Sequence, residues 1–332
     1  MRQLYDIKIN SNETRSFCYY NINGKRVKIY NGKKFNKNIY PNKEKDRTKR
    51  RALLEKLKKI IENNFDPNRL TTTKSPINKS AADNIYDQSI FKERIALDLY
   101  EHPNDGSIAV ATKIAELIKK KQAQNKYCII GLATGSSPIS IYEELVRLHK
   151  DEGLSFNNVI TFNLDEYVPM DPNSIHSYYK FMYENLFNHI DINKANIHIP
   201  KGDLSRKEIG KYCVEYEKKI DKLGGLDFQL LGIGRNGHIG FNEPGSVESS
   251  ITRKVNIEYT TRFDASEEFG GIERVPKEAI SMGIKTILKA KRIVLVAWGD
   301  QKAKVIKKAV EEDENELIPA SLLQNHPNTL FV

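Results

Sequence analysis

The sequence predicts a doubly wound α/β domain with a mostly parallel sheet, preceded by a small basic α+β segment. From about residue 91, short apolar runs alternate with amphipathic segments of helical length. Small and polar residues follow several of these apolar runs, where such sheets bind their ligands. The excess of positive charge is confined to the first part of the chain. We therefore expect a basic segment over 1–70, a linker over 71–90 and the α/β domain over 91–332.

The first seventy residues carry the basic character. They hold 19 lysines and arginines against 7 acidic residues, a net charge of +12, whereas the rest of the chain holds 34 against 36. Strand-like runs over 3–9, 15–20 and 26–30 surround Asn23-Gly24, a hairpin signal. Residues 46–62 predict an amphipathic helix with a basic outer face. A solvated accessory segment and a nucleic-acid contact both remain open.

The α/β domain follows from the order of its predicted elements. Helices are expected over residues 108–120, 138–150, 177–188, 206–222 and 301–311. Strands are expected over residues 127–132, 159–163, 228–233, 293–297 and 329–332. Helices alternating with strands in this way are typical of parallel sheets.

Apolar runs and cysteine spacing indicate the cellular compartment. No run of eighteen apolar residues is present, so no membrane-spanning helix is predicted, and the first residues lack the apolar stretch of a signal peptide. The three cysteines, Cys18, Cys128 and Cys213, have no spacing suited to zinc or disulfides. We expect a cytoplasmic protein without a metal site, in which Cys128 and Cys213 are buried as small apolar residues.

The first candidate site is the segment Gly131-Leu-Ala-Thr-Gly-Ser-Ser-Pro138, between a predicted strand and helix. Its small residues allow backbone N–H groups to approach an anion, and the helix start adds a positive dipole end. A phosphate is the natural ligand for Thr134, Gly135, Ser136 and Ser137. A tight turn with a helix cap explains the same residues equally well.

A pair of carboxylates follows the next predicted strand. Asp165 and Glu166 stand in Thr161-Phe-Asn-Leu-Asp-Glu-Tyr167 and point in different directions, so that one can act while the other supports it. A carboxylate beside a bound sugar can move a proton between C1 and C2. The alternative is a capping or salt-bridging pair.

A histidine lies in a glycine-dense loop after the strand over 228–233. The segment is Gly232-Ile-Gly-Arg-Asn-Gly-His238-Ile-Gly-Phe-Asn-Glu-Pro244, and Glu243 stands five residues after the imidazole. A histidine with a carboxylate neighbour suits proton transfer near neutral pH. Single histidines are more often structural, but this context favours catalysis.

Lys302 lies at the start of the predicted helix over 301–311, in Trp298-Gly-Asp-Gln-Lys302. Its charge there can serve a phosphate. Taken alone, it would be an ordinary surface lysine.

Together these segments resemble the glucosamine-6-phosphate deaminase family over residues 96–332. The order and spacing of the phosphate loop, Phe162–Val168, His176-Ser-Tyr-Tyr179, Gly234–Pro244, Val275–Gly283 and Gln301-Lys302 carry the resemblance. It implies the Rossmann-like fold of these enzymes, of ribose-5-phosphate isomerases and of CoA transferases. It also implies a reaction, here grouped with the hydrolases, that needs no metal or cofactor: glucosamine 6-phosphate and water give fructose 6-phosphate and ammonia.

The resemblance further implies roles for individual residues. Asp165 would move the proton between C1 and C2, and His238 would assist ring opening with Glu243 and Asn236 beside it. The substrate phosphate would be held by Thr134, Gly135, Ser136, Ser137 and Lys302. Glu166 and Arg262 would support the site.

Three departures from the family pattern give further expectations. Asn236 stands where some members carry Asp, which predicts a shifted pH optimum. Glu267 falls where many members have a second arginine for the phosphate, which predicts weaker phosphate affinity. The sequence ends at Val332, before a further segment usual in the family, which predicts an exposed sheet edge.

Two other functions remain open. A 6-phosphogluconolactonase-like hydrolase would share the phosphate loop, but that group resembles Asp-Gly-His-Thr rather than the sequence around His238. A non-catalytic sugar-phosphate-binding regulator would need the loop but not Asp165, His238 and Glu243 together. The basic segment faintly resembles the arm region of tyrosine recombinases. The sequence leaves open whether the chain forms a homo-oligomer.

Overall fold

The computed structural model describes residues 8–12, 15–22, 25–29 and 93–332. The chain divides into two compact units, Met1–Tyr86 and Asp87–Val332, and each is considered by itself. The predicted helix over 46–62 and the predicted linker over 71–90 lie outside the described residues.

The N-terminal unit contains a three-stranded antiparallel sheet in the order β1-β2-β3. Its strands are β1 (Lys8–Asn12), β2 (Arg15–Ile22) and β3 (Lys25–Ile29). Ile22 of β2 pairs with Lys25 of β3 across the predicted Asn-Gly turn. The hairpin expected from that dipeptide is therefore confirmed.

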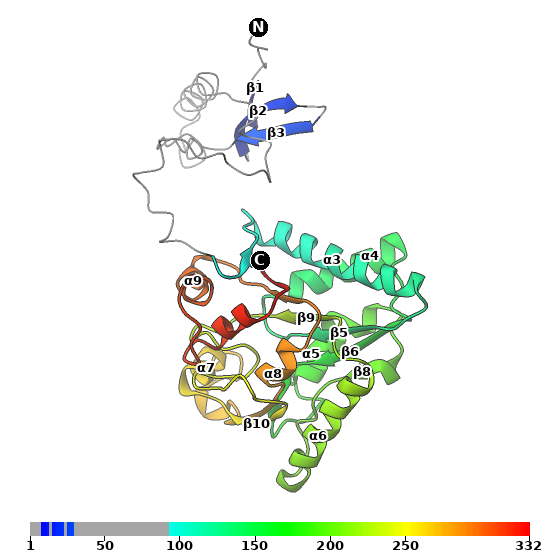
Figure 1. Cartoon of the computed structure of the whole chain (residues 1–332), viewed down its shortest axis with the longest axis vertical. Coiled ribbons are helices and arrows are strands. Elements are labelled where there is room, and N and C mark those ends of the chain that lie inside the picture. Colours follow the sequence, from blue (N-terminus) through cyan, green and yellow to red (C-terminus); the bar gives the residue numbers. More distant parts are fainter. Residues whose placement is uncertain (1–7, 13–14, 23–24, 30–92) are drawn as a thin grey trace. The chain divides into compact units, whose positions relative to one another are not determined.

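The second unit is built on a seven-stranded sheet in which every neighbouring pair of strands is parallel (Figure 1). In spatial order its strands are β4 (Ala96–Leu97), β13 (Thr329–Phe331), β12 (Ile293–Leu295), β9 (Phe228–Leu231), β5 (Cys128–Leu132), β6 (Val159–Asn163) and β8 (Ile197–His198). The predicted parallel α/β fold is confirmed. The last strand, β13, lies between β12 and β4 and is not an edge strand, and the expected exposure of a sheet edge stays a prediction.

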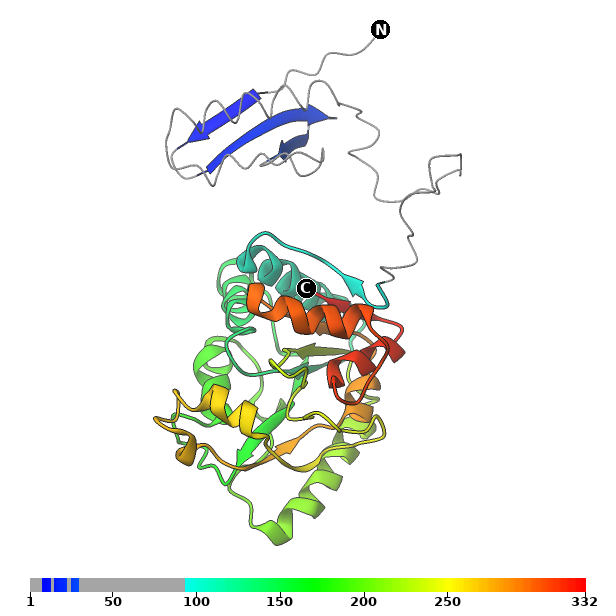
Figure 2. The ribbon, with the colours of Figure 1, turned by 90° about the vertical axis from the view of Figure 1, so that its left-hand side faces the viewer.

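Helices cover both faces of this sheet (Figures 1 and 2). One face packs against α3 (Pro103–Ala123), α4 (Ile139–Glu152) and α5 (Tyr178–Asn185). The other packs against α6 (Arg206–Lys222), α8 (Ile284–Leu288), α9 (Ala303–Glu311) and the 3₁₀ segment η8 (Pro319–Asn325). Strand alternation explains the two cores, because Ile130 belongs to the first and Ile129 to the second.

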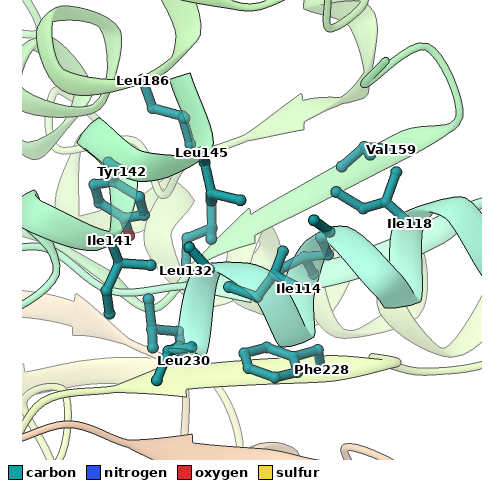
Figure 3. Packing of buried hydrophobic residues seen from close by; sticks show 14 of the residues in the cluster. Ile114, Ile118, Leu132, Ile141, Tyr142, Leu145, Val159, Leu186, Phe228 and Leu230 are labelled. Carbon is teal, nitrogen blue, oxygen red and sulfur yellow. The ribbon is translucent and has the colours of Figure 1, made fainter. Parts of the chain in front are cut away.

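The first core shows this packing in detail. Figure 3 shows side chains of α3 and α4 packed over Leu132, Phe228 and Leu230 of the sheet. Ile114 and Ile118, one helical turn apart on α3, are almost fully buried. Burial of this apolar stripe, rather than helix propensity alone, stabilises α3 against the sheet.

Local signals set the ends of several helices. α6 begins with a capping box between Ser205 and Glu208, and it spans the predicted residues. Gly153 caps the C-terminal end of α4, and its φ of 71° is left-handed and favours glycine. The predicted helix over 177–188 is divided into α5 and the 3₁₀ segment η4 (Phe187–His189).

A buried carboxylate links β5 to β9. Asp227 accepts a hydrogen bond from the backbone N–H of Ile129 at 3.0 Å and pairs with Lys121 at 2.6 Å and Lys291 at 2.8 Å. Burial opposes ionisation of Asp227, but the two lysines and the N–H outweigh it and hold its pKa below the usual range.

A second sheet, which the sequence did not predict, is antiparallel and has the order β10-β11-β7. Its strands are β10 (Arg253–Asn256), β11 (Glu278–Ser281) and β7 (Asp165–Val168). β6 ends at Asn163 and β7 begins at Asp165, so the chain passes from one sheet to the other at Leu164. Asp165 lies at this junction and is opposite Ser281 of β11.

Cys128 and Cys213 are buried and free, as expected. Among the described residues, no helix is long and apolar enough to cross a membrane.

Candidate active site

A cavity of about 280 Å³ opens beyond the carboxyl ends of four neighbouring strands, β12, β9, β5 and β6. The segments that follow these strands each contribute to its wall. The predicted site residues that line it are Thr134, Gly135, Ser136, Ser137, Asp165, His238 and Lys302. Residues far apart in the sequence therefore meet at one place, as expected for a doubly wound sheet.

The loop between β5 and α4 presents backbone donors to the cavity. Within the described part of the chain, the N–H groups of residues 134–137 have no hydrogen-bond partner. The carbonyl oxygen of Ser137 instead accepts a hydrogen bond from the indole of Trp298 at 2.8 Å. Gly135 has a φ of 91°, which favours glycine. A short turn with free N–H groups before a helix is a suitable anion site.

Asp165 is the buried carboxyl of the cavity. Its side chain is only 5% exposed, and no hydrogen bond to it is found among residues 93–332. Burial and the adjacent Glu166 raise its pKa to about 8. A buried acid without a partner is costly for stability, and such groups concentrate where chemistry is done.

Glu166 has different surroundings. Its carboxylate accepts hydrogen bonds from the N–H groups of Tyr167 at 2.9 Å, Tyr178 at 3.1 Å and Tyr179 at 3.0 Å. Burial raises its pKa to about 7, although these three donors oppose the shift. Glu166 lines a separate cavity, behind β7. It therefore ties the start of α5 to β7 and holds the strand that carries Asp165.

A chain of hydrogen bonds runs from Glu243 through Asn236 to His238. Asn236 Nδ2 donates to Glu243 Oε2 at 2.9 Å, and Asn236 Oδ1 lies 2.7 Å from His238 Nδ1. Because a carboxylate only accepts, the amide nitrogen of Asn236 faces Glu243 and its oxygen faces the imidazole. His238 Nδ1 therefore carries a proton, and Nε2 has no partner among the described residues.

Glu243 supports this arrangement from beneath the cavity. Its Oε2 lies 3.4 Å from His238 Nδ1. Burial opposes its ionisation, but bonds and charge from His238, with Thr261 and Asn236, hold its pKa below the usual range. Asn236 does more than stand in for Asp here, because its two ends join a carboxylate to an imidazole.

Gly234 makes room for the imidazole. A Cβ atom at this position would lie 2.0 Å from His238 Cε1 and 2.2 Å from Nδ1. The closeness shows that the ring lies directly against the backbone of its own loop. Any side chain at position 234 would displace it.

A short helix, α7 (Tyr259–Ala265), forms the outer wall of the cavity (yellow in Figure 2). Its Thr261 lies 3.3 Å from His238 Nδ1. Its Asp264 forms an ion pair of 2.8 Å with Arg235. Lys302 also lines the cavity and donates to the carbonyl of Ile233 at 2.8 Å. Burial, reinforced by Arg235, lowers the pKa of Lys302.

A family model described as Glucosamine-6-phosphate isomerases/6-phosphogluconolactonase matches residues 101–332, which form the whole of this cavity-bearing unit beyond its first strand. The chain belongs to this family. Glucosamine-6-phosphate deaminases of Clostridium botulinum (strain Langeland) and Thermoanaerobacter pseudethanolicus are 43% and 42% identical to it. These alignments cover 72% and 67% of the chain, and 94% and 87% of the two enzymes.

The chain covers very different shares of two further relatives. A glucosamine-6-phosphate deaminase-like protein of Bacteroides thetaiotaomicron is 44% identical over 74% of the chain, which spans only 37% of that protein. The structure of a monomeric glucosamine-6-phosphate deaminase matches with a TM-score of 0.68 and 40% identity, over 71% of this chain and 96% of that one.

Lactonases share the fold. The 6-phosphogluconolactonase of Trypanosoma brucei matches with a TM-score of 0.58 at 21% identity, over 73% of the chain and 95% of that structure. At this identity the likeness concerns the fold alone.

Some residues that the sequence predicted for the site lie outside the cavity. Glu243 and Asn236 stand behind His238, and Glu166 faces the other side of β7. Arg262 does not line the cavity, since it donates to the carbonyl of Ile272 at 2.9 Å and fastens α7 to the segment that follows it. Glu267 is exposed and does not line the cavity either.

Other residues of the cavity were missed. They are chiefly the aromatic wall and the charged residues of the rim: Tyr167, Tyr178, Phe241, Arg235, Thr261, Asp264 and Glu268. Tyr167, Tyr178, Phe241 and Arg235 stand inside segments that the sequence analysis singled out, but no role was assigned to them there. Asp264 of α7 and Glu268 just after it had no such signal, because nothing local connects them to the sheet.

The opposite pKa shifts of two buried aspartates predict opposite effects of the same substitution. The folded state holds the Asp165 proton more tightly than the unfolded chain, so Asp165 lowers stability progressively from about pH 4 to about pH 8. Asp165→Asn should therefore raise the melting temperature relative to the parent, by an amount that grows from pH 5 to pH 8.

Asp227→Asn is the matched control. The pKa of Asp227 is lowered, so its charge stabilises the fold above the pKa of the unfolded chain, and its loss should lower the melting temperature at neutral pH. Melting curves across pH 5–9 measure both. If the difference in melting temperature between Asp165→Asn and the parent does not grow with pH, the raised pKa of Asp165 is contradicted.

Proposed function

We propose that this chain is a glucosamine-6-phosphate deaminase. The observation that carries the proposal is the meeting, in one cavity, of a loop with free N–H groups, the unpartnered carboxyl of Asp165 and the Nε2 atom of His238. Identities of 42% and 43% to enzymes of that activity, over most of their length, support it.

The phosphate group of the substrate fits the loop between β5 and α4. The free N–H groups of Thr134, Gly135, Ser136 and Ser137 would donate to its oxygens, and the start of α4 adds a positive dipole end. Lys302 lines the same cavity and would add a full charge.

His238 is suited to opening the sugar ring. With its Nδ1 proton directed at Asn236, its Nε2 can accept the proton of the C1 hydroxyl and return it to the ring oxygen as the C1–O bond breaks. Glu243 stabilises any positive charge that the imidazole gains, directly and through Asn236.

Asp165 is suited to the isomerisation that follows. As a carboxylate it would accept the proton from C2 and return it to C1, so that C1 is reduced and C2 is oxidised within one molecule. The nitrogen on C2 becomes an imine, water adds to C2, and ammonia leaves to give fructose 6-phosphate. The reaction is an isomerising deamination, so its grouping with the hydrolases is corrected. Because burial raises the pKa of Asp165, the ionised fraction and the activity should both increase as the pH rises toward 8.

The two alternative functions receive less support. The likeness to lactonases lies near 20% identity and concerns the fold. A regulator without turnover would have no need of a destabilising buried carboxyl at Asp165 or of the tautomer that Asn236 sets on His238.

Release of ammonia from glucosamine 6-phosphate by the purified chain tests the proposal. We expect ammonia and fructose 6-phosphate to form in equal amounts. Asp165→Asn should reduce turnover roughly 10²- to 10⁴-fold, the range that general acid–base groups contribute. Saturable binding of the substrate without ammonia would favour the regulator. Hydrolysis of 6-phosphogluconolactone without deamination would favour the lactonase.

Gly234→Ala tests the position of the imidazole. The added Cβ would overlap His238 Cε1, so the ring must move, and we expect turnover to fall about 10²-fold. The matched control is Gly210→Ala on α6, where an added Cβ meets nothing within 4 Å and turnover should be unchanged. Circular dichroism establishes that both variants are folded. Equal activity of the two would show that His238 does not act.

We extend the proposal to the compartment and to the basic N-terminal segment. We infer a cytoplasmic enzyme, and the charge of +12 over residues 1–70 supports contact with a nucleic acid. If so, the full chain should bind duplex DNA or RNA with an affinity that falls steeply between 50 and 200 mM salt, a range over which phosphate contacts weaken by about 10³-fold or more. If no nucleic acid is bound at 50 mM salt, residues 1–70 are an accessory segment without that role. Light scattering of the same sample gives the oligomeric state.

A further inference from the structure

Two opposite charges face each other at the rim of the active-site cavity. Arg235 belongs to the glycine-dense loop after β9, and Asp264 belongs to α7. Both line the cavity, and Arg235 Nη2 lies 2.8 Å from Asp264 Oδ1. Their side chains are 59% and 43% exposed, so the pair is open to solvent and to any ligand that enters.

Lys302 lies within electrostatic reach of this pair. It lines the same cavity and donates to the carbonyl of Ile233, two residues before Arg235. After burial, which has the largest effect, the charge of Arg235 lowers the pKa of Lys302 and that of Asp264 raises it. Two cations therefore line one cavity within electrostatic reach of each other, and a carboxylate partly neutralises them.

We propose that Arg235 is a second cationic residue, beside Lys302, that binds the substrate phosphate. While the phosphate is absent, Asp264 occupies the place of the phosphate on Arg235. The inference rests on the proposed function, since it concerns the phosphate of that substrate. A guanidinium offers two parallel N–H donors and binds a carboxylate or a phosphate in the same manner. Asp264 thus resembles, in charge and geometry, the group that it would give way to.

The exchange of partners is physically favourable. A phosphate dianion that enters the cavity meets the carboxylate of Asp264 beside Lys302, and the two like charges repel each other. Transfer of Arg235 from Asp264 to the phosphate removes that conflict. The exposed pair contributes little to stability, so its loss costs little.

A different role would make the pair a simple latch between α7 and the loop of His238. A latch predicts that removing either partner has the same effect, because the contact is lost in both cases. Partner exchange predicts opposite effects, because Arg235 binds the phosphate and Asp264 competes with it. The direction in which each of the two substitutions changes phosphate affinity therefore separates these roles.

The experiment measures two constants: the Kd of the full chain for inorganic phosphate, by calorimetry, and the KM for glucosamine 6-phosphate. Arg235→Met should raise both constants roughly ten- to a hundred-fold, as expected for loss of a hydrogen bond to a charged group, and should affect KM more than kcat. Asp264→Asn should lower both constants. Arg235→Lys should fall between the parent and Arg235→Met.

Arg206→Met is the matched control, because Arg206 also forms an exposed ion pair, with Glu278 at 3.3 Å, but does not line the cavity. It should leave phosphate binding unchanged. An unchanged phosphate affinity in Arg235→Met, or weaker binding in Asp264→Asn, would overturn the inference. If the variants change phosphate affinity in the expected directions but the parent chain releases no ammonia, the proposed function is wrong and the inference about Arg235 stands.

Discussion

The parallel alignment of four neighbouring strands is the constraint on which the candidate site depends. β12, β9, β5 and β6 lie side by side, about 4.8 Å apart, and their carboxyl ends meet at one edge. Lys302, His238, the loop over 134–137 and Asp165 follow these strands in that order. Four segments spread over more than 160 residues of sequence thus surround one cavity, of a size suited to a sugar phosphate.

Hydrogen-bond partners divide the buried polar groups of the site into two kinds. Glu243 and Glu166 are satisfied by an amide, a histidine or backbone N–H groups, and they hold other residues in position. Asp165 has no such partner within the described residues and has a raised pKa. This contrast distinguishes a group that acts on a ligand from groups that support it, although all three are buried carboxyls.

Much of the fold could be predicted because apolar periodicity is a local property. The strand over 159–163 and the helix over 206–222 were predicted to the residue, since each buries a regular apolar pattern. The positions of Asp165 and His238 could be predicted as well, because both directly follow buried strands. The contact that Arg262 makes could not be predicted, since nothing in its sequence context shows that its side chain turns back to a carbonyl of its own segment.

By itself, the sequence of this protein determined the order of strands and helices, the parallel sheet and the chemical groups at the strand ends, because these depend on patterns within a few residues. Only the tertiary structure decided the contacts between distant segments. The antiparallel sheet pairs β7 with β11, more than a hundred residues later, and so orients Asp165. The bridging role of Asn236 depends on the fold of its loop. The pairing of Arg235 with Asp264 depends on where α7 packs, which no local pattern encodes.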